Sequence, residues 1–261
     1  MPEGDTVWRT ALHLDRALTG STLQATDFRV PDLATLDLSG HVVESTVSRG
    51  KHLLTRIGEH SLHTHLKMEG SWHLYKPGTS WRRPAHEARV VLRTEEWSAV
   101  GFALGIVEVV PRDAENTVVG HLGPDLLGPD WDEEEAVRRL LADPARPVVE
   151  AILDQRNLAG IGNLYKSELC FLAGVHPALP VGEVADLRRL VRRAKAALEA
   201  NKNRVEQTFT GDTRRGQQTW VFRRERQPCR RCGTPIRVDM LGPQMQERAT
   251  YWCPSCQPGQ R

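Results

Sequence analysis

Four cysteines near the C-terminal end constrain this chain more than any other feature. Cys229, Cys232, Cys253 and Cys256 follow the pattern C-x2-C-x20-C-x2-C. Two close pairs of thiolates suit a tetrahedral zinc ion, and in an intracellular protein this spacing favours zinc over disulfides. Four thiolates leave no open position for water, so we predict one structural zinc ion and no catalytic metal. Cys170 lies alone on an apolar stretch and is predicted to pack in the core.

The net charge of the 261 residues is only +2, but it is unevenly distributed. Residues 202–261 hold 12 Lys and Arg against five Asp and Glu, so the rest of the chain is net negative. A basic C-terminal quarter favours a nucleic-acid partner, although a solvated basic face is the alternative. Residues 1–10 lack the apolar core of a signal peptide, and no apolar run is long enough for a membrane span. We therefore expect a cytoplasmic protein without membrane contacts.

Hydrophobic periodicity predicts one helix followed by many short strands. In residues 6–18 the apolar residues of one helical face are Val7, Ala11, Leu14 and Leu18. Asp5 is a suitable N-terminal cap for this helix. Strand-like runs separated by turn residues follow at 21–30, 41–48, 52–57, 61–66, 71–75, 88–92 and 99–110. Such a succession of short strands predicts a β-sandwich.

After Pro111 the pattern becomes helical. We predict helices at 132–142, 148–155, 164–172 and 186–200. A tight double turn, residues 157–163, separates the second helix from the third. The chain is thus predicted to be an α+β multidomain protein with three parts. They are an N-terminal β-sandwich domain (1–112), a helical domain (113–220) and a zinc ribbon (221–261).

The start Met1-Pro2-Glu3-Gly4 carries the sharpest catalytic signal. Pro at position 2 generally permits removal of Met1, which exposes a secondary amine. Attack of this amine on C1′ of a deoxyribose gives an iminium ion, which acidifies the C2′ proton and permits elimination of the 3′ phosphate. Because the reference pKa of an α-amino group is about 8, a useful fraction is unprotonated at neutral pH. Taken alone, Pro at position 2 can also reflect processing only.

Four segments in this order resemble the formamidopyrimidine-DNA glycosylase/endonuclease VIII family. They are MPEGDTV (1–7), SRGKHLL (48–54), GIGNLY (160–165) and the terminal zinc ribbon. The resemblance covers essentially the whole chain, and the PEG start and YWCPSC ending are closer to the endonuclease VIII branch. It implies an N-terminal β-sandwich with a catalytic N-terminal helix, a helical domain with a helix–two-turn–helix, and a C-terminal zinc ribbon.

The resemblance implies four catalytic residues. Pro2 matches the Schiff-base nucleophile, and Glu3 matches the acid that assists opening of the sugar ring. Lys51 matches a β-hairpin lysine that contacts phosphate and donates a proton in β-elimination. Arg248 matches an arginine at the tip of the ribbon hairpin that clasps phosphates and assists δ-elimination. Taken singly, Glu3 can be a helix-dipole carboxylate, and Lys51 and Arg248 can be solvated surface residues.

Five further residues are implied to contact DNA: His65, Lys67, Met68, His121 and Asn163. Asn163 begins a helix whose free N–H groups suit a phosphate, although it can also be a plain N-cap. His65 matches a phosphate-contacting histidine, whereas lone histidines are often structural. Met68 resembles a wedge that fills the gap left by an extruded base, with core packing as the alternative. Lys67 and His121 stand where endonuclease VIII has a DNA-contacting glutamine and arginine.

Two departures from the family pattern bear on the substrate. Thr6 stands where many members carry a second glutamate. Residues 99–105 (AVGFALG) lack the arginines with which the formamidopyrimidine branch reads the opposite base, so we expect weak opposite-base discrimination. We expect a monomeric DNA glycosylase with AP lyase activity and no redox cofactor. It would excise oxidised bases, pyrimidines rather than 8-oxoguanine, and leave a gap by β,δ-elimination.

Two other functions compete with this prediction. A non-catalytic family member would bind damaged or abasic DNA without cleaving it, although the four catalytic residues are intact. An unrelated zinc-ribbon protein of transcription or translation would explain the cysteines and the basic charge, but not residues 1–170.

Overall fold

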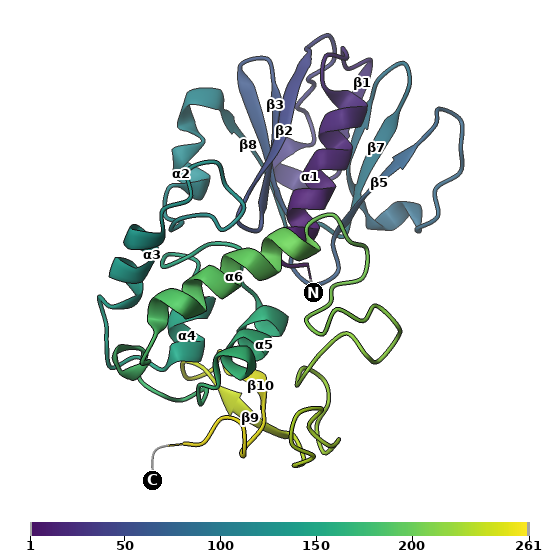
Figure 1. Cartoon of the computed structure of the whole chain (residues 1–261). Helices are drawn as coiled ribbons and strands as arrows, with labels where there is room; N and C mark the ends of the chain where they lie inside the picture. The colour runs from purple at the N-terminus through teal and green to yellow at the C-terminus, as the bar shows by residue number, and fades with distance from the viewer. Residues whose placement is uncertain (1, 260–261) are drawn as a thin grey trace. The chain divides into compact units, whose positions relative to one another are not determined.

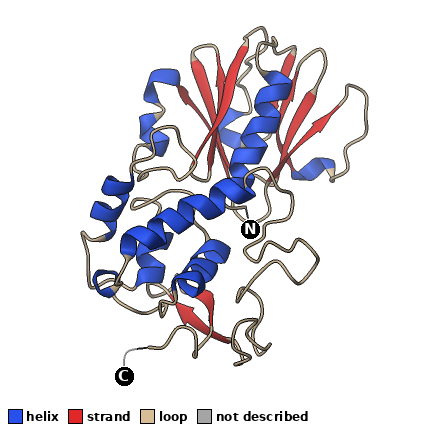
Figure 2. Cartoon of the chain, viewed as in Figure 1, coloured by secondary structure: helices blue, strands red, loops and turns tan. Residues whose placement is uncertain are grey.

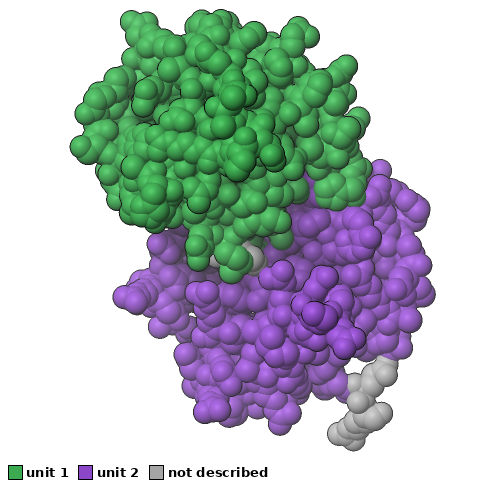
Figure 3. All heavy atoms as spheres, turned by 180° about the vertical axis from the view of Figure 1, so that it is seen from behind, with its two compact units in different colours: residues 1–121 green, residues 122–261 purple. Residues whose placement is uncertain are grey.

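The chain divides after His121 into two units, each with its own hydrophobic core (Figure 3). The computed structural model describes residues 2–259. None of the described helices is long and apolar enough to cross a membrane. The predicted division into three parts, with a separate ribbon from residue 221, stays a prediction.

The first unit consists of one long helix and two four-stranded antiparallel sheets (Figures 1 and 2). The helix is α1 (Gly4–Leu18). One sheet contains, in spatial order, β2 (Val43–Arg49), β3 (His52–Ile57), β4 (His60–His65) and β8 (Ile106–Pro111). The other contains β1 (Ala25–Phe28), β6 (Ala88–Arg93), β7 (Ser98–Phe102) and β5 (Ser71–Tyr75). Buried residues of both sheets and of α1 share one core, which confirms the predicted β-sandwich.

Helix α1 is held in the sandwich by its predicted apolar face. Val7, Ala11, Leu14 and Leu18 are all at most 3% exposed. The helix packs along β2 and also contacts β3 and β5 (Figure 1). The prediction that Asp5 caps this helix is wrong, because the helix begins at Gly4 and its N-cap is Glu3. Asp5 lies buried in the first turn, where its Oδ1 accepts the N–H of Thr6 at 2.7 Å.

The run 99–110, predicted as one strand, is two strands in different sheets. Strand β7 pairs with β5 and β6, whereas β8 pairs with β4. The chain turns between them at Ala103, whose φ is +47°. At Gly105 an added Cβ would overlap the side chain of Lys67, so the absence of a side chain permits this close approach. Continuous apolar character cannot reveal such a change of sheet, because apolar residues of both strands pack against the same core.

Short elements complete the first unit. They are 3-10 turns at Pro31–Leu33, Ala85–Glu87 and Arg112–Ala114, and the four-residue helix α2 (Asn116–Val119).

The second unit contains the four predicted helices and a two-stranded ribbon. The helices are α3 (Glu133–Leu140), α4 (Val148–Leu153), α5 (Asn163–Ala173) and α6 (Leu187–Asn201). A 3-10 turn (Val181–Glu183) precedes α6, and β9 (Arg237–Leu241) pairs antiparallel with β10 (Arg248–Trp252). Helix α5 begins one residue before the predicted start, with Gly162 as N-cap. Cys170 on α5 is fully buried, as predicted, and burial raises the pKa of its thiol to about 12.

Candidate functional site

The N-terminal residues are positioned by α1. Pro2 is partly buried and comes two residues before the first helical residue, Gly4. Glu3 has extended backbone angles, is only 1% exposed, and its carbonyl accepts the N–H of Val7 at 3.0 Å. A partly accessible proline therefore lies beside a buried glutamate at the start of an anchored helix. Met1, whose removal would free the Pro2 amine, lies outside the described residues.

Lys51 lies at the tip of a tight hairpin. Arg49 and His52 pair across β2 and β3, so Gly50 and Lys51 form a two-residue turn. Gly50 has φ of +57°, which is the conformation that a type II′ turn requires at its first central residue. The short turn fixes the backbone of Lys51 at the end of the sheet.

Four histidines gather beside this turn. His52 stacks on His63 with ring centroids 5.0 Å apart, and its Nδ1 lies 2.8 Å from Nε2 of His63. Edge-on contacts place the rings of His65 and His121 at 4.8 Å and 5.9 Å from His52. The positive charges of Lys51 and Lys67 both act on His65. The structure thus brings together Lys51, Lys67, His65 and His121, which the sequence predicted separately.

Three histidines of this cluster, His52, His63 and His65, are neutral near pH 7 because their pKa values are lowered. Burial lowers the pKa of His52 to about 3, and neighbouring histidines and Lys67 add to this. Burial, followed by the charges of Lys67 and Lys51, lowers the pKa of His65 to about 4. The pKa of His63 is also lowered, first by burial. Because the N–H of Lys67 donates to Nδ1 of His65 at 2.9 Å, the neutral ring carries its proton on Nε2. His65 therefore keeps one N–H donor without a charge.

Sequence reasoning did not predict the hydrogen bonds that hold this histidine cluster in place. Nδ1 of His63 lies 3.2 Å from Oε2 of Glu108, and a carboxylate can only accept, so His63 donates from Nδ1. Its Nε2 then accepts from Nδ1 of His52. The side chain of His63 is only 3% exposed, so the row Glu108–His63–His52 is fixed by β3, β4 and β8. In the sequence, the three histidines of β4 (His60, His63 and His65) hint at it.

Met68 lies on the surface next to this cluster in sequence. Its side chain is 62% exposed, so the alternative that it packs in the core is wrong. Lys67 before it has φ of +51°, in the left-handed region, and is also exposed. The N–H of Gly105 donates to the carbonyl of His65 at 3.0 Å, which ties this turn to the loop after β7.

In the second unit, α5 is joined to the ribbon next to Arg248. Nδ2 of Asn163 donates to the carbonyl of Ala249 at 2.9 Å. Arg248 is the exposed first residue of β10 and pairs with Leu241 of β9. Asn163 is the first residue of α5 and not its N-cap. Its Oδ1 is buried and has no hydrogen-bond partner within the described residues 2–259.

The four paired cysteines form the candidate metal centre. All four Sγ atoms lie within 4.8 Å of one another. Three of the separations are 3.9 Å (Cys229–Cys256), 3.5 Å (Cys232–Cys253) and 3.5 Å (Cys232–Cys256). Zn–S bonds of about 2.3 Å in a tetrahedron place sulfur atoms about 3.8 Å apart, whereas a disulfide requires about 2.05 Å. The four thiols therefore fit one zinc ion and are not disulfide-bonded.

A buried carboxylate on α5 holds the chain that leads into the ribbon. Glu168 is fully buried and accepts the backbone N–H groups of Trp220, Val221 and Phe222 at 2.8–2.9 Å. Gln257 makes a second link, since its Nε2 donates to the carbonyl of Val175 while its Oε1 accepts the N–H of Cys253. Sequence reasoning missed both residues, although an acidic residue inside an apolar helix was a visible signal.

Comparison with known proteins agrees with these features. Residues 1–103 match the model of the formamidopyrimidine-DNA glycosylase N-terminal domain, and residues 122–209 match that of its H2TH domain. The chain is 54% identical to "Probable endonuclease 8 2" of Streptomyces coelicolor, over 99% of this chain and 95% of the relative. It is 52% identical to "DNA-(apurinic or apyrimidinic site) lyase Nei2" of Mycolicibacterium smegmatis, over 98% and 99%.

Solved structures show the same fold. One is MutM in complex with DNA that contains carbocyclic 8-oxo-G, with a TM-score of 0.82 and 21% identity over 99% of this chain and 100% of that one. Another is the formamidopyrimidine DNA glycosylase of Lactococcus lactis, bound non-covalently to DNA with an AP site. It has a TM-score of 0.81 and 20% identity over 98% and 100% of the two chains.

Proposed function

Because the chain belongs to the formamidopyrimidine-DNA glycosylase/endonuclease VIII family, on its endonuclease VIII branch, we propose that Pro2 starts the excision of oxidised pyrimidines from DNA. The protein is a base-excision-repair DNA glycosylase with AP lyase activity. The competing assignment to an unrelated zinc-ribbon protein is wrong. The observation that carries the proposal is the partly accessible Pro2 beside the buried Glu3 at the start of α1.

The proposed reaction begins with a free Pro2 amine. Its nitrogen attacks C1′, and the bond from C1′ to the damaged base breaks with its electron pair leaving on the base. The ring C1′–O4′ bond opens as the iminium ion forms, and Glu3 supplies a proton to the ring oxygen. A water molecule takes the C2′ proton and the 3′ phosphate leaves in β-elimination, with Lys51 as the proton donor to the departing phosphate oxygen. A second elimination expels the 5′ phosphate, assisted by Arg248. Water then hydrolyses the iminium, which releases the sugar fragment from Pro2 and leaves a one-nucleotide gap.

The histidine cluster supports a role in holding the DNA backbone. Lys51 and Lys67 supply positive charge, and neutral His65 supplies an N–H donor to a phosphate oxygen. His121 is exposed at the edge of the cluster. A neutral donor can approach phosphate beside two lysines without adding to their mutual repulsion. We assign the exposed Met68 as the wedge that enters the base stack when the damaged nucleotide is extruded.

In the second unit, we assign phosphate binding to the start of α5 and to Arg248. The amide side chain of Asn163 and the positive N-terminal end of α5 suit an anion. The bond from Asn163 to Ala249 fixes the start of β10, and therefore the backbone that carries the Arg248 guanidinium. One zinc ion held by the four cysteines would brace the hairpin. The zinc is structural and takes no part in the proposed reaction, and we expect the protein to act as a monomer.

Borohydride trapping tests the nucleophile. We expect the wild type to form a covalent adduct with abasic duplex DNA when the iminium is reduced, and mass spectrometry to find Met1 removed. Pro2→Gly should lose most adduct and strand cleavage, while an exposed change on the same helix, Arg16→Gln, should keep both. DNA binding by the wild type without any adduct would favour the non-catalytic alternative. Full activity on a chain that retains Met1 would refute the assignment of Pro2.

A further inference from the structure

The turn that carries Met68 joins β4 to β5 and comprises residues 67–70, which we call the wedge turn. Its backbone is tightly folded. The N–H of Gly70 donates to the carbonyl of Leu66 at 2.9 Å, and a Cβ on Gly70 would overlap that carbonyl. Lys67 has φ of +51°, a conformation that residues other than glycine adopt at a cost in free energy. Such a turn keeps its shape only where the surrounding structure supports it.

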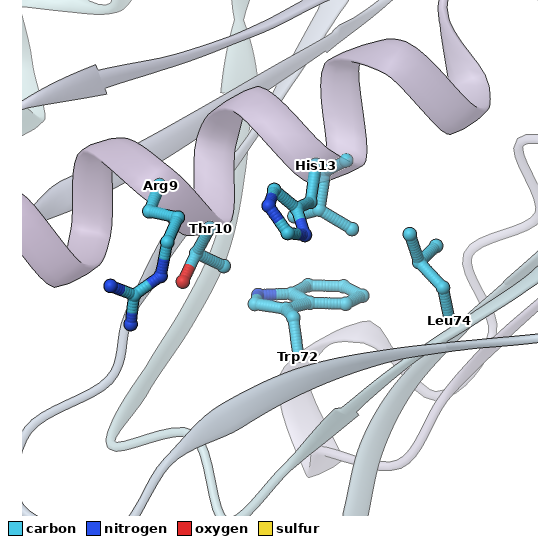
Figure 4. A pocket seen from close by; sticks show the side chains of 6 residues that line it. Arg9, Thr10, His13, Trp72 and Leu74 are labelled. Carbon is cyan, nitrogen blue, oxygen red and sulfur yellow. The ribbon is translucent and has the colours of Figure 1, made fainter. Parts of the chain in front are cut away.

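Strand β5, which follows the wedge turn, is fixed on the face toward α1. Figure 4 shows the side chains of Trp72 and Leu74 pointing to α1, where they line a small pocket with residues of that helix. The Nε1 atom of Trp72 also donates to Oγ1 of Thr64 on β4 at 3.3 Å. Because side chains alternate along a strand, Ser71 lies on the opposite face of the sheet. That face needs support of its own next to the wedge turn.

Arg83 supplies this support from the loop between β5 and the 3-10 turn that precedes β6. Its Nη1 atom donates to the carbonyl of Glu69 at 3.0 Å and to Oγ of Ser71 at 2.9 Å. Its Nε and Nη2 atoms lie 2.7 Å and 2.5 Å from Oε2 of Glu87. The guanidinium carbon lies 5.5 Å from the ring centroid of the buried Phe102. All three nitrogen atoms of the Arg83 side chain are therefore engaged.

We propose that Arg83 is a positioning residue that holds the wedge turn in the shape with which Met68 enters the base stack. This inference rests on the proposed role of Met68 and adds the residue that fixes it. Glu69 directly follows Met68, so a bond to its carbonyl fixes the backbone from which the Met68 side chain projects. A turn that is already ordered loses little conformational freedom when the wedge enters DNA, and entry is therefore favoured.

The geometry favours positioning over direct binding of DNA by Arg83. Arginines at DNA interfaces commonly bind phosphate, but the charge of Arg83 is already paired with Glu87. The planar guanidinium reaches Glu87 and Glu69 in two directions, which a lysine ammonium cannot do. The two roles also differ in the effect of Glu87→Gln. This change raises the net positive charge and would strengthen a phosphate contact, whereas it would loosen the support of the wedge turn.

Stopped-flow fluorescence can measure wedge entry without the chemistry. A duplex carries a tetrahydrofuran analogue of the abasic site, which cannot form the Schiff base, next to 2-aminopurine, whose fluorescence reports unstacking. We expect Arg83→Lys to slow the fluorescence change and to weaken binding of this duplex by about two- to tenfold, because the loosened turn must be ordered on entry. Glu87→Gln should have a similar effect. Arg82→Lys, at the exposed neighbouring arginine, should behave like the wild type.

A double-mutant cycle tests whether Arg83 acts through Met68. In a Met68→Ala background, Arg83→Lys should change binding of the duplex by less than about twofold, because no wedge is left to position. An equal effect in both backgrounds would overturn the positioning role, as would wild-type behaviour of Arg83→Lys or tighter binding by Glu87→Gln. Thermal unfolding identifies a variant that fails to fold, and the other of the two variants then decides.

Failure of this inference differs from failure of the proposed function. Wild-type kinetics for Met68→Ala would remove the wedge and with it the role of Arg83, while Pro2 would remain the nucleophile. A wild type that forms no adduct in borohydride trapping would remove Pro2 as the nucleophile. The inference on Arg83 would then still stand, because the tetrahydrofuran duplex reports wedge entry alone.

Discussion

The histidine cluster makes the stability of the sandwich sensitive to acid. His52 has a folded-state pKa of about 3, lowered first by burial, against an ordinary value of 6.5. As pH falls below 6.5, the unfolded chain protonates this histidine while the folded chain keeps it neutral. The unfolded state therefore binds more protons, and the free energy of unfolding decreases as pH falls from about 6.5 toward 3.

The size of this effect follows from the two pKa values. At pH 5.0, 1.5 pH units below 6.5, one histidine that stays neutral in the folded state costs about 2 kcal/mol, at about 1.4 kcal/mol per unit. The cost at pH 5.0 is the same for any folded-state pKa well below 5. His63 and His65 act in the same direction, because their pKa values are also lowered. Replacing His52 with Phe, which retains a ring to stack on His63, removes the contribution of His52.

Urea unfolding at pH 7.5 and pH 5.0 measures this contribution. We expect the free energy of unfolding of the wild type to fall by about 2 kcal/mol more than that of His52→Phe between the two pH values. Other titrating groups, including the zinc ligands, are common to both proteins and cancel in the comparison. His86→Gln, at an exposed histidine, should behave like the wild type. An equal loss in wild type and His52→Phe would refute a neutral His52 in the folded protein.

Three other changes have distinct expected outcomes. Cys253→Ser removes one of four thiolates, so bound zinc measured by atomic absorption should fall well below one ion per chain, and full retention would contradict the site. Met68→Ala should change the free energy of unfolding by less than about 0.5 kcal/mol, because the side chain is exposed. It should slow excision from duplex more than from single-stranded DNA, and equal slowing would contradict the wedge. Gly105→Ala should lower the free energy of unfolding by about 1–3 kcal/mol in urea titrations, because the added Cβ would overlap the side chain of Lys67. If the variant has wild-type stability, the loop adjusts and the close approach is not required.

Most features of the helices could be predicted from local sequence patterns. The buried face of α1 and the positions of α3 to α6 follow from 3.6-residue periodicity, which the sequence displays directly. The start of α1 was misplaced, because a carboxylate near a helix start can be either a cap or a first-turn residue. Asp5 is the latter, and it is buried. The single predicted strand at 99–110 failed for a different reason, since the choice of sheet depends on pairing partners far away in sequence.

The sequence by itself determined the family, the cysteine quartet and the identity of the residues expected to act on DNA. These depend on residue type, order and spacing, which are properties of the chain before it folds. Only the tertiary structure decided what surrounds them. The row Glu108–His63–His52 beneath His65, the three amides held by Glu168 and the bond from Arg83 to Glu69 arise where segments distant in sequence meet. Burial and hydrogen-bond partners, and therefore protonation states, are set by those non-local contacts.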